Sequence, residues 1–183
     1  MSTTIEHAER VQVKLYGEGA KLSEEALVPV WHRWISERRV EDDTLIDVAD
    51  YGHVKDGPGI ALIGHGADFF YDEGEGRPGL LIFRKRAFEG DLRARLEDAF
   101  TRVLLAKSWL EAEPGLGARF GSDEVLVRIL DRLHAPNDDA TFEALAPIVR
   151  EVAEKALGHA VEVSRAGTPK GPLSARVRRA AEA

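Results

Sequence analysis

Cysteine is absent from this sequence of 183 residues, and long apolar runs are absent as well. Without cysteine there is no disulfide framework, no thiolate nucleophile and no zinc or iron–sulfur site with cysteine ligands. No apolar run approaches the roughly 18 residues that a membrane-spanning helix needs. The first ten residues, MSTTIEHAER, are polar and lack the charged and then apolar order of a signal peptide. We therefore expect a cytoplasmic protein that has no membrane partner.

The residues that are present indicate a folded domain. Apolar residues make up 44% of the chain and charged residues 31%, so the apolar content is ordinary for a globular protein. A chain of this length can bury roughly 70% of its unfolded surface. We predict a flexible N-terminus over residues 1–10, a single domain over 11–165 and a tail over 166–183.

The charges are distributed unevenly along the chain. The net charge is −7, but residues 165–183 hold five basic side chains and one acidic side chain, a local charge of +4. The rest of the chain therefore carries −11. Phosphate binding needs a basic face, so nucleic acid is not expected as a partner except through the tail. The sequence TPKGP at 168–172 cannot form the interior of a helix or strand, and we predict a basic, disordered tail.

Hydrophobic periodicity predicts strands and helices along the domain. Residues 11–16 (VQVKLY) alternate between apolar and polar side chains, which predicts a strand with lysine on its polar side. Further strands are predicted over residues 45–54, 60–65, 80–83, 125–130 and 161–163. Helices are predicted to begin after the N-caps Ser23, Asp91 and Asn137 or Asp138, and the third to end at Gly158.

Two segments of the chain resemble each other. VQVKL at 11–15 matches VLVRI at 125–129, and EALVPV at 25–30 matches EALAPI at 143–148. Each copy reads as strand, helix and strand. The pattern predicts an α+β fold, with an antiparallel-rich sheet and about three helices on one face, similar to a ferredoxin-like arrangement of two β-α-β repeats. Chance similarity between two amphipathic units is the alternative.

Residues 47–86 are the most unusual part of the sequence, because eight of the 17 glycines lie between Gly52 and Gly79. Glycine allows positive φ angles and a close approach of the backbone to a ligand. We therefore predict that this segment binds a ligand. The predicted ligand-binding residues are Tyr51, Gly57, Gly59, Gly64, Arg77 and Arg84.

Two histidine–aspartate pairs in the same segment are candidates for acid–base catalysis. His65 is followed three residues later by Asp68, and His53 is preceded by Asp50. A carboxylate next to an imidazole can orient it as a general base. The alternative is that each histidine is hydrogen-bonded near a turn and has a structural role. No G-x-S-x-G sequence is present, so a serine nucleophile is not predicted.

Metal and nucleotide sites are not predicted. If the turn after residue 54 pairs Val54 with Ile60, the two histidines share a face of the sheet but lie about 13 Å apart, too far for one metal ion. No H-E-x-x-H or H-x-H sequence occurs, and no glycine cluster matches a P-loop or a dinucleotide fingerprint. The sequence therefore identifies no cofactor.

Several stretches resemble a family of uncharacterised bacterial proteins. The matching stretches are VPVWHRWI at 28–35, LIDVADYGHV at 45–54, GPG at 57–59, GH at 64–65 and GLLIFRK at 79–85. The resemblance covers roughly residues 11–86. It implies a bacterial origin and marks residues 47–86 as a signature of the family, but it implies no activity, cofactor or substrate.

The sequence favours a non-enzymatic module that binds a ligand or takes part in protein assembly through residues 47–86. This prediction rests on the lack of a complete catalytic motif and on glycine-rich strands that can receive a small molecule or a partner strand. An enzyme with His/Asp acid–base chemistry on a small molecule is the alternative. A homodimer, formed through an unprotected sheet edge or through the tryptophan-containing helix, is a third expectation.

Overall fold

The computed structural model describes residues 4–55, 57–86 and 89–181. Its eight strands form one antiparallel sheet in the order β2-β3-β4-β5-β1-β6-β8-β7. The strands are β1 (Val11–Gly17), β2 (Leu45–Asp50), β3 (Ile60–Gly64), β4 (Ala67–Asp72), β5 (Gly79–Arg84), β6 (Phe120–Ile129), β7 (Val161–Ala166) and β8 (Leu173–Arg179).

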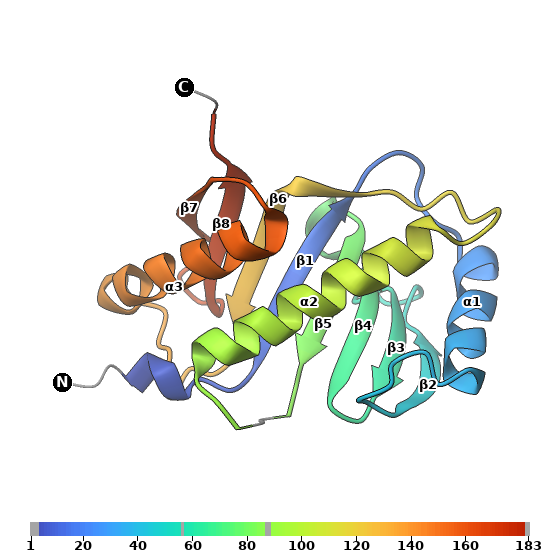
Figure 1. Cartoon of the computed structure of the whole chain (residues 1–183), viewed down its shortest axis with the longest axis horizontal. Coiled ribbons are helices and arrows are strands. Elements are labelled where there is room, and N and C mark those ends of the chain that lie inside the picture. The colour runs from blue at the N-terminus through green and yellow to red at the C-terminus, as the bar shows by residue number, and fades with distance from the viewer. Residues whose placement is uncertain (1–3, 56, 87–88, 182–183) are drawn as a thin grey trace.

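Three helices cover one face of this sheet (Figure 1): α1 (Glu24–Ser36), α2 (Leu92–Glu111) and α3 (Asp139–Leu157). Their predicted N-caps are confirmed, because the side chains of Ser23, Asp91 and Asp138 each accept a backbone hydrogen bond from the residue three positions later. Gly158, with a φ of 75°, ends α3 as predicted. The α+β class with helices on one face is therefore confirmed.

A single apolar core lies between the sheet and the helices. It includes Val11, Val13 and Leu15 of β1 and Trp31 and Trp34 of α1. In Figure 1, α2 crosses the middle of the sheet, α1 lies beside β2, and α3 lies beside β7 and β8. No helix among the described residues has the length and apolar character needed to cross a membrane.

Both predicted strand–helix–strand units are present, as β1–α1–β2 and β6–α3–β7. β1 and β6 are antiparallel neighbours at the centre of the sheet, with Val13 opposite Val127. After each helix the chain runs to one edge of the sheet and returns by antiparallel strands. The first unit returns through β3, β4 and β5, whereas the second returns through β8 alone.

The prediction of disordered ends is wrong for the described residues. Ile5, within the short 3-10 helix η1 (Thr4–His7), and Ala8, just after it, are buried in the core, although the sequence predicted a flexible segment over residues 1–10. Residues 1–3 and 182–183 lie outside the described residues. Within the predicted tail, Gly171 closes a turn onto Thr168, and the chain then forms β8.

β8 is an internal strand of the sheet, between β6 and β7. Its alternate side chains Leu173, Ala175 and Val177 are buried against the helices. Arginines at 176 and 178 occupy the opposite face. The arginines raise the charge of the segment and hide this period-two pattern, which explains why composition alone predicted disorder.

The strand register in the glycine-rich segment also differs from the prediction. β2 ends at Asp50, which pairs with Ile60, so the predicted pairing of Val54 with Ile60 is wrong. The loop between them is closed by a hydrogen bond from the backbone N–H of Tyr51 to the carbonyl oxygen of Gly59 (2.8 Å). β4 was not predicted, because its sequence ADFFYD is largely buried and lacks alternation.

The loop that holds the 3-10 turn η2 (Gly74–Gly76) packs on the face of the sheet away from the helices, where Gly74 contacts Lys14 of β1 and Glu75 pairs with Arg128 of β6. Beneath it, Lys14 is fully buried, although the alternation of β1 predicted it on a polar face. The Nζ atom of Lys14 lies 2.5 Å from Oδ2 of Asp72 and 3.2 Å from the carbonyl oxygen of Gly74. A buried ion pair therefore joins β1 to the start of this loop.

Candidate functional site

The structure does not bring His65 and Asp68 together as a catalytic pair. His65 is exposed in the turn between β3 and β4, whereas Asp68 is buried. Oδ1 of Asp68 accepts hydrogen bonds from the backbone N–H of Gly64 (3.0 Å) and from Nζ of Lys85 (2.7 Å). Between residues 4 and 181, as far as the structure describes them, no hydrogen bond or ion pair joins His65 to Asp68. Asp68 therefore has a structural role in this turn.

His53 and Asp50 do share a cavity, of about 530 Å³, at the opposite end of β3. Oδ1 of Asp50 accepts a hydrogen bond from the backbone N–H of Gly52 (2.7 Å). The same cavity contains Glu24 from the start of α1, and the carboxylate of Asp50 raises the pKa of Glu24. This carboxylate pair was not predicted from the sequence, because 25 residues separate its members. β3 spans about 16 Å, so the two histidines belong to different cavities.

The predicted ligand-binding glycines approach the protein's own backbone. A Cβ atom on Gly59 would lie 2.2 Å from the carbonyl oxygen of Tyr71, and one on Gly64 would lie 2.2 Å from that of Ala67. Tyr51, Gly57 and Gly59 also border a small cavity of about 160 Å³. Tight packing within the β2–β5 meander therefore accounts for Gly59 and Gly64 without a ligand.

The two predicted arginines are directed to different parts of the molecule. The guanidinium of Arg77 lies 3.6 Å from the ring centroid of Tyr16, over the face without helices, and pairs with Glu124 (2.8 Å). Arg84 instead pairs with Asp98 of α2 (3.4 Å). The structure therefore does not place Arg77 and Arg84 around one ligand.

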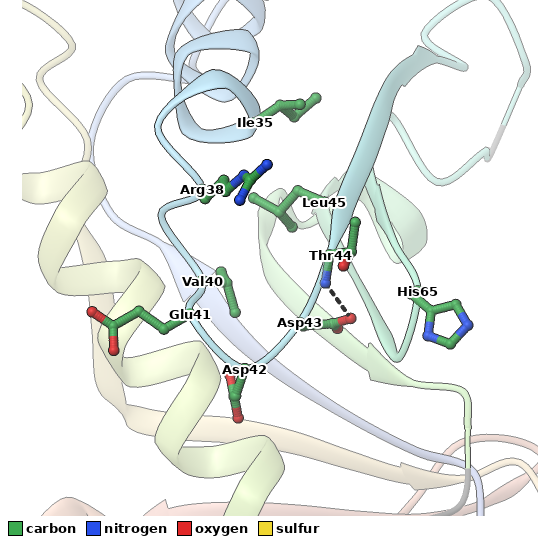
Figure 2. Close-up of a pocket in the computed structure, with 9 residues that line it drawn as sticks. All are labelled: Ile35, Arg38, Val40, Glu41, Asp42, Asp43, Thr44, Leu45 and His65. Carbon is green, nitrogen blue, oxygen red and sulfur yellow. Dashed lines mark hydrogen bonds between the residues drawn. The ribbon is translucent and has the colours of Figure 1, made fainter.

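A cavity of about 600 Å³ lies between the end of α1 and the start of β2 (Figure 2). It is lined by Ile35, Arg38, Val40, Glu41, Asp42, Asp43, Thr44, Leu45 and His65. Figure 2 shows the Arg38 side chain extending toward Leu45, whereas the side chains of Glu41 and Asp42 extend away from Leu45. Of the residues predicted from the sequence, only His65 lines this cavity, and its ring stands apart from Arg38.

Arg38 has an unusual backbone conformation, with a φ of 51°. It follows the cap of α1, where the N–H of Arg38 donates to the carbonyl of Ile35 and the N–H of Arg39 donates to that of Trp34. Glycine usually occupies this left-handed position at the end of a helix. Any other L-residue pays about 1–2 kcal/mol for the conformation. Among the residues that the structure describes, none forms an ion pair or hydrogen bond with the Arg38 guanidinium.

Asp43 fixes one wall of this cavity. Its Oδ1 accepts hydrogen bonds from the backbone N–H groups of Thr44 and Gly66 (both 2.8 Å), and its Oδ2 accepts one from Ala67 (2.9 Å). The carboxylate therefore ties the segment before β2 to the turn between β3 and β4. Its oxygens are already occupied by N–H donors of the protein.

Replacing Asp43 with alanine is expected to lower the free energy of unfolding by about 2 kcal/mol, because two partly buried N–H groups from the β3–β4 turn lose their acceptor. Urea denaturation followed by circular dichroism measures this change. Glu41→Ala, which removes an exposed acid from the same segment, is the control and should change the free energy by no more than about 0.5 kcal/mol. Equal effects of the two substitutions would contradict the role assigned to Asp43.

Neither metal-binding geometry nor similarity to known proteins identifies a reaction. Within residues 4–55, 57–86 and 89–181, no group of three or more histidine, aspartate or glutamate side chains is arranged to hold a metal ion. No protein-family model matches the chain, and no curated protein is significantly similar to it. The function is therefore argued from the cavities and from the charged groups that line them.

Proposed function

We propose that the protein is a non-enzymatic binding module that takes a small organic carboxylate with an apolar body in the cavity of Figure 2. Arg38 carries this proposal. It occupies a backbone conformation that favours glycine and extends its guanidinium, which has no partner among the described residues, along the cavity. A guanidinium binds a carboxylate through two parallel hydrogen bonds, so a ligand would compensate for the conformational cost of Arg38.

The rest of the lining supports an anion with an apolar body. Ile35, Val40 and Leu45 supply apolar surface next to the guanidinium, and the volume of about 600 Å³ is typical of small-molecule sites. Two nearby carboxylates compete little for Arg38. Asp42 pairs with Arg102 of α2 (2.5 Å), and Asp43 is occupied by backbone N–H groups.

The second candidate is an enzyme with acid–base groups at His53, Asp50 and Glu24. One observation favours it: the Asp50 carboxylate raises the pKa of Glu24 inside a cavity that also contains His53. A raised pKa makes a carboxyl group better suited to donate a proton as a general acid. All three side chains are exposed, however, and Oδ1 of Asp50 already accepts the N–H of Gly52. The cavity of Arg38 is therefore the better-supported site.

Arg38→Gly is expected to stabilise the fold and to abolish binding at the same time. Glycine relieves the left-handed strain, which should raise the free energy of unfolding by about 1 kcal/mol. Removal of the guanidinium should weaken the binding of octanoate or benzoate at least tenfold, a change of about 1.4 kcal/mol. Isothermal titration calorimetry with these two carboxylates, together with urea denaturation, measures both effects.

Arg39→Gly is the matched control. Arg39 is the next residue, and its guanidinium lies over Trp109 (4.9 Å to the ring centroid), outside the cavity of Figure 2. This variant should retain octanoate binding and should gain no stability. The proposal fails if neither carboxylate binds the unmodified protein saturably, or if Arg38→Gly binds them as tightly as the unmodified protein.

A further inference from the structure

The sheet has two edge strands, β2 and β7, and each has one side that no other described strand pairs with. Such an edge presents backbone N–H and C=O groups that can pair with another chain. The two edges differ in how far these groups are protected. A second copy of the chain is expected to pair with the less protected edge strand.

The β2 edge is protected, contrary to the expectation of unprotected edges. Its register with β3 shifts between Leu45 and Asp47, so the strand carries a bulge. Oδ1 of Asp47 accepts the backbone N–H of Val48 (2.8 Å), one of the groups that point away from β3. Pairing of two β2 strands would also collect four aspartates, Asp47 and Asp50 from each copy, in one patch. Bulges and acidic side chains both disfavour strand addition.

The β7 edge is regular over all of its six residues. The N–H of Ala180 donates to the carbonyl of Ala160, so alternation directs the backbone groups of Val161, Val163 and Arg165 away from β8. Glu154 of α3 accepts the N–H of Val161 (3.2 Å). For the N–H groups of Val163 and Arg165, the described part of the chain provides no such acceptor.

The Arg165 side chain does not cover the outward N–H and C=O groups of β7. Its guanidinium pairs with Asp139 at the start of α3, donates to Asn137 (2.7 Å) and lies 5.9 Å from the ring centroid of Phe142. The side chain is therefore drawn toward α3 and away from the position of an added strand. On the other face of β7, Ser164 is small and exposed.

We propose that β7 pairs with β7 of a second copy of this chain, across a two-fold axis at Val163, so that two sheets become one. In this register Val163 lies opposite Val163 of the partner subunit, and Val161 lies opposite Arg165 of the partner subunit. All of these residues direct their backbone groups outward, as hydrogen-bonded pairs require. The register forms six N–H···O bonds, four from the N–H groups of Val163 and Arg165 and two from those of Val161, which replace its contact with Glu154.

The charges of the face without helices complement each other in this register. Glu162 pairs across the strands with Arg178 of its own β8, and Ser164 pairs with Arg176. The two-fold axis places Glu162 opposite Ser164 of the partner subunit. Glu162 then lies two strands, or about 10 Å between Cα atoms, from Arg176 of the partner subunit. Long Glu and Arg side chains span this distance over the small serine, and each carboxylate lies between two arginines.

Sedimentation velocity of the full chain tests the proposal. The chain has a mass of 20.2 kDa, and a species of twice this mass is expected at high protein concentration, with dissociation on dilution because a single strand pair makes a small interface. Val163→Pro removes an N–H that points away from β8, so it should abolish the dimer while the β7–β8 bonds remain. Val48→Pro makes the same change on the other edge strand and should leave the dimer intact.

Glu162→Arg provides a second variant whose side chain is exposed, in case Val163→Pro fails to fold by circular dichroism. It places a cation between Arg178 and Arg176 of the partner subunit and should weaken dimerisation at least tenfold. A monomer at every concentration of the unmodified protein overturns the proposal. So does a dimer that folded Val163→Pro or Glu162→Arg leaves unchanged, or one that Val48→Pro abolishes.

Discussion

Replacing Asp72 with alanine is expected to lower the free energy of unfolding by about 3–5 kcal/mol, the typical cost of leaving one member of a buried ion pair without its partner. Lys14 has no exposed surface, and its Nζ lies 2.5 Å from Asp72. Without the carboxylate, the ammonium group keeps two neutral contacts among the described residues, the carbonyl oxygen of Gly74 at 3.2 Å and the ring of Tyr16 at 5.5 Å from its centroid, and neither balances its charge. The chain must then bury an unpaired charge or open the loop over β1.

Urea denaturation of Asp72→Ala and two further variants measures this cost. Glu73→Ala is the matched control, because Glu73 pairs with Lys21 at the surface and should contribute less than about 1 kcal/mol. Lys14→Met removes the buried charge and keeps an apolar side chain of similar length, so it should be tolerated much better than Asp72→Ala. If Asp72→Ala costs no more than Glu73→Ala, the Lys14–Asp72 pair does not anchor the loop.

Gly59→Ala is expected to cost about 3 kcal/mol or more, because two separate penalties add at this residue. Gly59 has a φ of 68°, in the left-handed region. The added Cβ would also lie 2.2 Å from the carbonyl oxygen of Tyr71, so the hairpin that pairs β3 with β4 would have to shift. Thermal and urea unfolding both report this loss of stability.

Gly76→Ala separates the two penalties. Gly76 has a φ of 67°, but nothing lies within 4 Å of the position of its Cβ. This control should therefore cost only the left-handed strain, about 1–2 kcal/mol. If both variants lose the same stability, the contact with Tyr71 does not constrain Gly59, and a ligand role for this glycine becomes the better explanation.

The helices were well predicted from the sequence because their signals are local. The caps Ser23, Asp91 and Asp138 act on N–H groups three residues away, and apolar residues at helical spacing follow each of them. Strands depend more on their neighbours. β4 is surrounded by paired strands and carries buried side chains on both faces, and in β8 the arginines hide the alternation. Neither strand shows the simple pattern of a sheet that is exposed on one face.

The candidate site was harder to predict, because nearness along the chain does not imply that side chains meet. His65 and Asp68 are three residues apart, yet Asp68 pairs with Lys85 instead. Arg38 belongs to no motif, and the one available signal was an arginine where a helix usually ends in glycine. Lys14 and Asp72 are 58 residues apart, and only the folded sheet brings them together.

The order of strands in the sheet constrains the order in which the protein can assemble during synthesis. β1 is the first strand to be synthesised, but it lies at the centre of the sheet. Its backbone groups therefore stay unpaired on one side until β5 has been synthesised and on the other side until β6 has been synthesised. β7 leaves the ribosome before β8, its one strand partner in the sheet. The β2–β5 meander consists of neighbouring strands and can form early, whereas β7 can dock only after residues 173–179 have emerged. Insertion of the basic strand β8 between β6 and β7 is therefore expected to follow formation of the β2–β5 meander and to complete this half of the sheet.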